Sequence, residues 1–204
     1  VNQGTVNWSS AYLRSGGGGS FTNASGGTFN DVQTSGYTIH NPSNFGGTFS
    51  FVNAGTYLRN TTGATYFDIP FTNSGTLSLL GNGEIQLRAG GTMSATSVVH
   101  AAAGTRLYFT NNYSLATGSK FLGPGLINQV GGTLTIDGTL TASSFVWSGG
   151  NWNAATSSGL TTLIASGSTL NLTHDSDATR DFYGRAVVNQ GTVNWSSAYL
   201  RSGG

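Results

Sequence analysis

The chain has 204 residues, enough for one large all-β domain or two small ones, and only 7% of them are charged. Eight basic and seven acidic side chains leave it close to neutral, which excludes the basic stripe that binds nucleic acid and any strong attraction to anionic lipid. Cysteine is absent, so disulfides and thiolate metal sites are excluded as well.

The first seventeen residues, VNQGTVNWSSAYLRSGG, return without a substitution at positions 188–204. Two unrelated strands do not arrive at the same seventeen letters, so the offset from Val1 to Val188 defines a repeat. The chain has no initiator methionine, and Val1 falls inside a phrase that reads in full near the end as GRAVVNQGTVNW. We therefore expect residues 1–187 to be one repeat unit and residues 188–204 to be the start of the next, within a longer tandem array.

A shorter pattern runs through the repeat: an apolar residue, any residue, Asn, a short insert, Gly-Thr and another apolar residue. It begins at Phe21, Phe51, Phe71, Leu126 and Val187, and in a stretched form at Ile39. Asn and Gly tolerate the left-handed backbone conformation of a tight corner, and Thr favours re-entry into a strand. The pattern therefore predicts corners between short strands.

Apolar and polar residues alternate after these corners, which is typical of half-buried strands. No window shows a convincing helical period, so the chain is predicted to be all-β. We expect the following alternating residues to point into the core: Leu77, Leu79, Ile85, Leu87, Leu134, Ile136, Leu170 and Leu172.

Two all-β architectures compete. Tandem β-sandwich repeats would have about 90–100 residues per domain, whereas a parallel β-helix would have coils of about 20. Thr28 and Thr48 are separated by one such coil length, and so are Thr56 and Thr76. Thr5 precedes Thr28 by a slightly longer interval, and no segment resembles an inter-domain linker. We therefore predict a right-handed parallel β-helix (a β-solenoid) with about eight to nine coils in each repeat unit.

This architecture makes two further predictions. Asn53 and Asn73 occupy equivalent places, so their amides should stack in a ladder. The segments 1–17 and 188–204 should adopt the same conformation, related by a translation of about 40 Å along the axis and some rotation from sheet twist.

The phrases FYGRAVVNQGTVNWSS, GGTFSFVNAGTYLRNTTGATYFDIPFTNSGTLSLL and AAAGTRLYF resemble the long Gly/Thr/Asn-rich repeats of giant bacterial surface proteins. Those repeats are similar to the secreted parallel β-helix of the filamentous-haemagglutinin type. The resemblance covers most of the chain and implies an extracellular, elongated protein that forms fibres or acts as an adhesin. It implies no catalytic residues.

The sequence contains few candidates for catalytic residues. The only cluster of acids is HDSDATRD at residues 174–181, where Asp175 and Asp177 would share one face of an extended strand. A polar loop in which Asp pairs with Arg180 or Arg185 explains it better than acid–base catalysis. The three histidines have no metal-ligand spacing, and no phosphate loop or serine elbow is present. We predict no enzyme, no cofactor and no metal.

Trp147 and Trp152 flank a Gly-Gly corner in FVWSGGNWN. If both point outward they would form a shelf for sugar rings, and if both point inward they fill the coil. The predicted function is a structural segment of a giant extracellular fibre, whose partners are copies of the same repeat, end to end. The alternative is an adhesin module that binds polysaccharide through exposed aromatics. Lateral filament neighbours are further candidate partners, and neither nucleic acid binding nor membrane insertion is expected.

Overall fold

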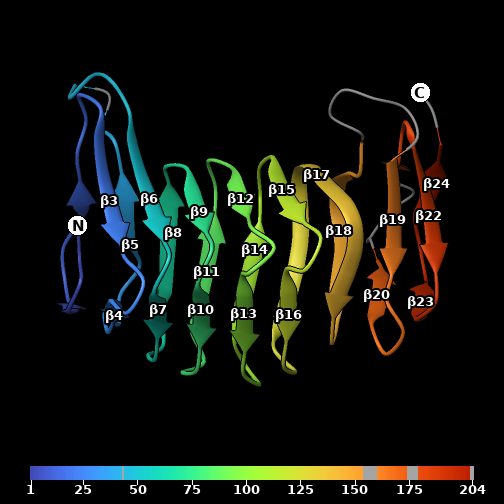
Figure 1. Ribbon diagram of the computed structural model, residues 1–204, viewed down its shortest axis with the longest axis horizontal. Helices are drawn as coiled ribbons and strands as arrows, with labels where there is room; N and C mark the ends of the chain where they lie inside the picture. The colour runs from blue at the N-terminus through green and yellow to red at the C-terminus, as the bar shows by residue number, and fades with distance from the viewer. Residues whose placement is uncertain (43, 154–159, 174–178, 203–204) are drawn as a thin grey trace.

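The computed structural model describes residues 1–42, 44–153, 160–173 and 179–202, and in these ranges the chain forms β-strands and no helix. The strands wind coil after coil along one axis, with the two ends of the chain at opposite ends of the stack (Figure 1). Each strand pairs in parallel with the strand one coil further on. The chain is therefore a β-solenoid of the parallel β-helix type with about eight coils, and the sandwich alternative is wrong.

Three faces, here called A, B and C, run along the solenoid. Face A holds β3 (Gly19–Asn23), β6 (Phe49–Asn53), β9 (Phe71–Asn73), β12 (Gly91–Met93), β15 (Tyr113–Ala116) and the middle of β17 (Leu126–Ala142). Face B holds β1 (Thr5–Trp8), β4 (Thr28–Asp31), β7 (Thr56–Arg59), β10 (Thr76–Leu79), β13 (Val98–Ala101), β16 (Lys120–Leu122) and the end of β17.

Face C is continuous from one end of the stack to the other. It holds β2 (Leu13–Arg14), β5 (Tyr37–His40), β8 (Ala64–Asp68), β11 (Glu84–Leu87), β14 (Arg106–Phe109), the start of β17, β18 (Phe145–Asn151), β20 (Thr169–Leu172) and β23 (Thr192–Trp195). The chain visits the faces in the order B, C, A, and β17 runs through three of them without a break.

Faces A and B continue through the last coils with shorter strands. On face B, β19 (Leu160–Ile164) pairs with residues 138–140 of β17, and β22 (Arg185–Asn189) pairs with β19. On face A, β21 (Thr179–Asp181) pairs with β24 (Tyr199–Arg201). The Trp152 amide, just after β18, donates to the Asp181 carbonyl (2.7 Å), which places β21 above that segment.

The register corrects one predicted corner. Thr5 pairs with Thr28, and Thr56 pairs with Thr76, as the spacing predicts. Thr28, however, pairs with Thr56 and not with Thr48, so the coil that starts at Thr28 is longer than the coil that starts at Thr56. The extra length lies in the connection from β5 to β6, where Thr48 precedes a strand of face A. Equal spacing of Gly-Thr pairs was therefore misleading here, because the same dipeptide occurs at corners of two kinds.

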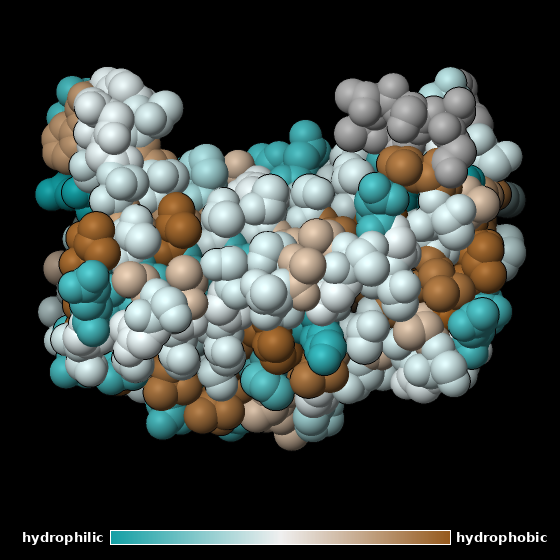
Figure 2. Space-filling view, viewed as in Figure 1, coloured by the Kyte–Doolittle hydropathy of each residue, from teal (hydrophilic) through white to brown (hydrophobic). Residues whose placement is uncertain are grey.

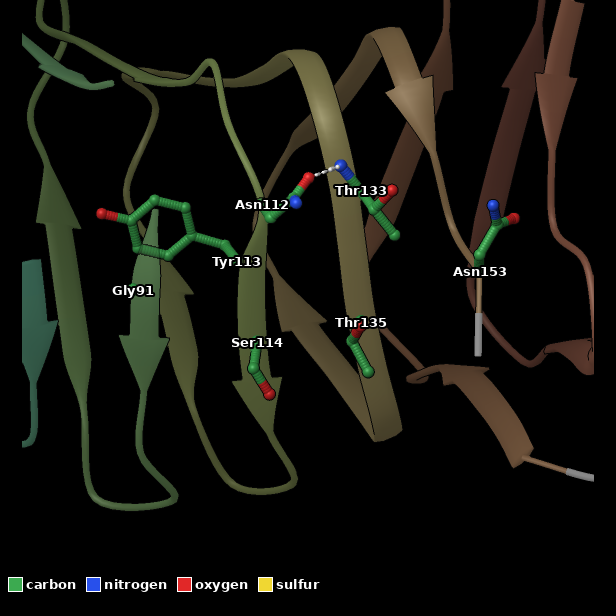
Figure 3. Close-up of a pocket in the computed structure, with 7 residues that line it drawn as sticks. All are labelled: Gly91, Asn112, Tyr113, Ser114, Thr133, Thr135 and Asn153. Carbon is green, nitrogen blue, oxygen red and sulfur yellow. Dashed lines mark hydrogen bonds between the residues drawn. The ribbon is translucent and has the colours of Figure 1, made fainter. Parts of the chain in front are cut away.

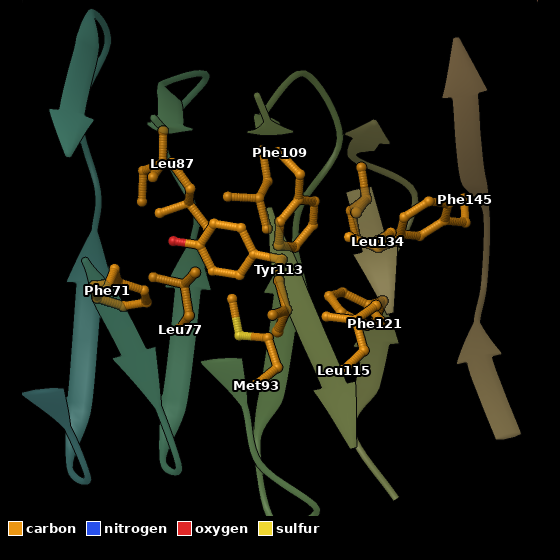
Figure 4. Packing of buried hydrophobic residues seen from close by; sticks show 14 of the residues in the cluster. Phe71, Leu77, Leu87, Met93, Phe109, Tyr113, Leu115, Phe121, Leu134 and Phe145 are labelled. Atoms are coloured by element: carbon orange, nitrogen blue, oxygen red, sulfur yellow. The ribbon is translucent and has the colours of Figure 1, made fainter. Parts of the chain in front are cut away.

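The core is a continuous apolar column inside the coils (Figure 4). All eight residues predicted to point inward are buried, with at most 2% of each exposed. Burial of one such side chain stabilises the fold by about 1.5–3 kcal/mol. Aromatic rings form a stack of their own near the N-terminal end, with neighbouring centroids 4.6 to 5.8 Å apart between Phe29, Phe51, Tyr57, Phe67 and Phe71.

The asparagine ladder is confirmed and is longer than predicted. Asn53 donates from Nδ2 to Oδ1 of Asn73 (2.7 Å) and accepts at Oδ1 from Asn23 (2.8 Å). Asn2 continues the row with a bond to Asn23 (2.7 Å). All four amides are buried, and each step joins one coil to the next. The ladder satisfies polar groups at a corner where the backbone leaves the sheet.

One charged pair lies inside the coils. Arg59 Nη1 lies 2.6 Å from Asp31 Oδ1, and both side chains are fully buried. Tyr57 donates its hydroxyl to the other carboxylate oxygen of Asp31 (2.7 Å), and Arg59 Nη2 donates to the Thr62 carbonyl (2.9 Å). Burial raises the pKa of Asp31, and the positive charge of Arg59 opposes that shift. Each member of the pair thus has a further hydrogen-bond partner, while Arg59 Nε is buried without one among the described residues.

Candidate functional site

The two tryptophans predicted as a sugar-binding shelf face the inside of the solenoid. Trp147 is 2% exposed and Trp152 is fully buried. Their rings stack with centroids 4.4 Å apart and an angle of 4° between the planes. Trp152 Nε1 donates to Gln129 Oε1 (2.7 Å), and Trp147 Nε1 donates to the Gly150 carbonyl (3.0 Å). The outward shelf is therefore wrong for this pair: each indole finds both an apolar neighbour and a hydrogen-bond acceptor in the interior.

The acidic cluster is only partly described. Residues 174–178, which include Asp175 and Asp177, lie outside the described residues. Arg180 is buried, and Asp181 forms a bidentate pair with Arg201, from Nε to Oδ1 (2.8 Å) and from Nη2 to Oδ2 (3.0 Å). These hydrogen bonds lower the pKa of the Asp181 carboxyl. Asp181 thus ties β21 to β24.

A polar groove lies on face A and has a volume of about 500 Å³ (Figure 3). Ser114 and Thr135 stand side by side on β15 and β17, and Asn112 Oδ1 accepts a hydrogen bond from the Thr133 amide (2.8 Å). Asn153 lies across from them. The described residues that line the groove include no charged side chain, so they offer hydroxyl and amide groups to a neutral ligand.

The groove matches no motif of the linear sequence, because its residues come from several coils. The register places Thr72, Thr92, Ser114 and Thr135 in one row of successive strands. In the sequence, these residues are recognisable as a Ser or Thr that recurs once per coil at a strand position whose side chain points away from the core. Figure 2 shows one face of the molecule, on which pale residues predominate and brown and teal residues are scattered among them.

The two duplicated segments adopt the same local conformation. Trp8 Nε1 donates to the Ala11 carbonyl (3.0 Å), and Trp195 Nε1 donates to the Ala198 carbonyl (2.9 Å). Both alanines have a positive φ, 68° for Ala11 and 85° for Ala198, which is unusual for a residue with a Cβ. The same residues therefore fold alike at opposite ends of the solenoid.

The two copies are paired on opposite sides. Among the described strands, β1 in the first copy pairs only with β4, the strand of the coil that follows it. In the second copy, β23 pairs only with β20, the described strand of the coil before it. The glycine that precedes each strand has different surroundings in the two copies. A Cβ on Gly4 would meet nothing within 4 Å, whereas a Cβ on Gly191 would lie 2.4 Å from the Ser168 carbonyl oxygen of the coil before it.

Each copy therefore leaves one edge of its strand and one side of its core uncovered. Val6 and Leu13 are only partly buried in the first copy, as are Val193 and Leu200 in the second. Trp195 is 59% exposed. An uncovered strand edge with apolar side chains beside it is a template for further strand pairing. We therefore regard the duplicated segments, residues 1–17 and 188–202, as the candidate functional site, because they share one sequence and pair with a neighbouring coil on opposite sides.

Metal ligands do not gather on the ends or faces that the structure describes. Within the described ranges no three His, Asp or Glu side chains come together in a way that would hold an ion. Among the same residues there is also no helix suited to cross a membrane.

Comparison with known proteins adds no relative. No family model, no curated protein and no solved structure matches the chain.

Proposed function

We propose that this chain is a structural segment of a giant extracellular bacterial fibre or stalk, built from tandem β-helix repeats stacked end to end. One observation carries the proposal: the same seventeen-letter segment stands at both ends of the stack, and each copy lacks the partner that the other copy has. The hydrogen bonds of the two copies are complementary. The Gly4 carbonyl accepts from the Thr28 amide (2.8 Å), while the Thr192 amide donates to the Ser168 carbonyl (2.9 Å).

The core supports the same proposal. Terminal repeats of a solenoid normally carry polar caps that close the apolar column. Here the inward position of β1 and β23 is a valine in both copies, Val6 and Val193, with Phe29 beside the first and Leu170 beside the second. A repeat joined at this point would bring the apolar side chains of the two copies together at this position, while the buried Arg180 and Arg185 lie on the neighbouring strands β21 and β22.

A two-period chain, in which residues 18–204 are repeated once after Gly204, tests the array. We expect one rod about 40 Å longer than the rod of the original chain, because eight coils at about 4.8 Å add that length. Small-angle scattering measures the length. Two separate units joined by a flexible hinge, or a compact globule, would contradict the proposal.

Extracellular location is part of the proposal and rests on composition. A chain with no cysteine, one lysine and few charges resembles secreted repeat proteins more than cytosolic domains. Antibodies raised against the purified chain should label intact cells of the source bacterium. Labelling that requires permeabilised cells would place the fibre inside and contradict this part.

A second candidate function, binding of neutral polysaccharide as an adhesin, is supported by the groove on face A. Hydroxyl and amide groups such as Ser114 and Asn112 suit the hydrogen-bonding of sugar hydroxyls. The double variant Ser114→Arg/Thr135→Arg should no longer be retained on neutral polysaccharide matrices, because the larger side chains fill the groove. Ser78→Arg, on face B, is the matched control and should leave retention unchanged; equal retention of both variants would end this candidate.

A further inference from the structure

The repeat does not contain a whole number of coils. β1 lies on face B, and the identical β23 lies on face C. Face C holds nine successive strands from β2 to β23, which are eight coil-to-coil steps. Because β1 comes one face before β2, the distance from β1 to β23 is eight coils and one face.

The neighbouring elements show the same offset. Asn2 pairs with Asn23 on face A, whereas its counterpart Asn189 lies at the end of β22 on face B. β2 lies on face C, and β24, the counterpart strand, lies on face A. The whole duplicated segment has therefore moved one face forward in the direction of the chain.

The side chains at both ends fit a junction with this offset. On one side, Asn194 Nδ2 donates to Asn171 Oδ1 (2.8 Å). On the other, Asn7, the counterpart of Asn194, accepts at Oδ1 from Asn30 (2.8 Å). The two bonds use different atoms of the same amide, so one residue can make both. A joined stack would carry an unbroken ladder from Asn171 through the shared asparagine to Asn30.

The arginine of the duplicated segment behaves in the same way. Arg201 pairs with Asp181 on the preceding coil. Arg14, its counterpart, has its guanidinium carbon 5.9 Å from the ring centroid of Phe45 on the following coil. One arginine at the junction can therefore contact a carboxylate behind it and an aromatic ring ahead of it.

Building on the array of the proposed function, we propose that the end surface of this chain receives a second copy of the repeat turned by one face. Face B of the incoming copy stacks on face C of the copy before it. Each repeat thus advances about 40 Å and turns by about a third of a turn, apart from sheet twist. A surface feature such as the groove on face A then returns to the same side of the rod only at every third repeat.

Disulfide cross-linking in the two-period chain tests the one-face offset. Because the chain has no native cysteine, only the introduced pair can form a disulfide. In the proposed junction Asn194 lies beside Asn30 of the second period, at the spacing of paired strands, which permits a disulfide. We expect Asn194→Cys combined with Asn30→Cys in the second period to oxidise to a cross-link, seen as a mobility change reversed by reductant. The matched control combines Ala186→Cys, which is on face B, with the same second-period cysteine, and should stay reduced.

The outcomes separate the offset from the array. Cross-linking of the Asn194 pair alone supports the one-face offset. Cross-linking of the Ala186 pair, or of neither pair, in a chain that small-angle scattering shows to be a longer rod overturns the offset and leaves the array standing. A chain that is not a longer rod overturns the proposed function itself. Each substituted position is exposed or half-buried, and circular dichroism of each variant confirms that the β content is kept.

Discussion

At the level of single residues, the charged pair inside the solenoid stands out in a molecule with so few charges. Asp31 and Arg59 follow Phe29 and Tyr57 by two positions, so strand alternation places them on the inward side. The pair joins two adjacent coils of face B. A buried ion pair contributes little net stability compared with apolar residues, but breaking it leaves one charge without a partner.

Arg59→Leu is therefore expected to lower the free energy of unfolding by about 3–5 kcal/mol. The double variant Asp31→Leu/Arg59→Met removes both charges and should lie within about 2 kcal/mol of the wild type. Urea unfolding followed by tryptophan fluorescence measures both. A single variant as stable as the double variant would show that the remaining Asp31 carboxyl is accommodated without its partner.

The two counterpart arginines give a prediction about pH. The hydrogen bonds from Arg201 lower the pKa of Asp181, so the pair stabilises the folded state above the ordinary carboxyl pKa of about 3.9. That contribution is lost as pH falls through the lowered pKa of the folded state. Arg201→Gln should return the Asp181 pKa to the ordinary range in an NMR titration. Arg14→Gln, the same change in the first copy, should leave it where it is; an equal response to both would contradict the pairing.

At the level of elements, the corners depend on glycines that let one coil approach the next. Gly55 and Gly75 precede Thr56 and Thr76 in stacked corners, and a Cβ on Gly75 would lie 2.1 Å from the Gly55 carbonyl oxygen. Backbone cannot give way as a flexible side chain can. The Gly-Thr pairs of the sequence therefore mark close approach between coils as well as turns.

Gly75→Ala should lower stability by about 1–3 kcal/mol, in the range typical of overpacking. Gly4→Ala is the matched control, because Gly4 occupies the same corner in the first coil, where a Cβ has open space. Its unfolding midpoint should stay within experimental error of the wild type. Gly191, the counterpart of Gly4 in the second copy, has a coil before it, and a Cβ there would lie 2.4 Å from the Ser168 carbonyl oxygen; its substitution should therefore be as costly as that of Gly75.

The buried asparagine ladder is also a property of stacked elements. Asn53→Ala removes the acceptor of Asn23 and the donor to Asn73 and to the Thr76 carbonyl. We expect a loss of about 1–3 kcal/mol from the buried groups left unsatisfied. Asn30→Ala, at a half-buried position, removes a ladder bond of the same length at the surface and should cost less than about 0.5 kcal/mol. Equal costs would mean that burial does not matter for the ladder.

At the level of the whole molecule, alternation and corner spacing were enough to predict the parallel β-helix and the inward side chains. Leu77 and Leu170 are buried because strand periodicity fixes the side to which a residue points, whatever its neighbours. Coil length was harder to predict from the sequence, because Thr48 and Thr56 both follow glycine and only the strand pairing shows which of them aligns with Thr28. Trp147 and Trp152 were ambiguous because two glycines between them interrupt the alternation that would have shown their side.

The groove and the one-face offset could not be predicted from the sequence, for a different reason. The groove joins residues such as Asn112 and Thr135 from successive coils, so it depends on the register between strands. The offset depends on counting faces, and the unequal lengths of the coils within the repeat leave that count open. The duplicated letters predict a tandem repeat, whereas the change from face B to face C between the two copies appears only in the pairing of β1 and β23.

The parallel ladders described above run along the rod, and this has a mechanical consequence. Tension applied to the two ends of the chain pulls on the outermost coil first, and its hydrogen bonds open one after another rather than together. A single chain held in an optical trap should therefore lengthen in small steps, each releasing one coil of about 20 residues, or about 65–70 Å of extended chain. The bond between Arg59 and Asp31 should delay one of those steps. A fibre made this way would yield gradually under load and rewind when the load is removed.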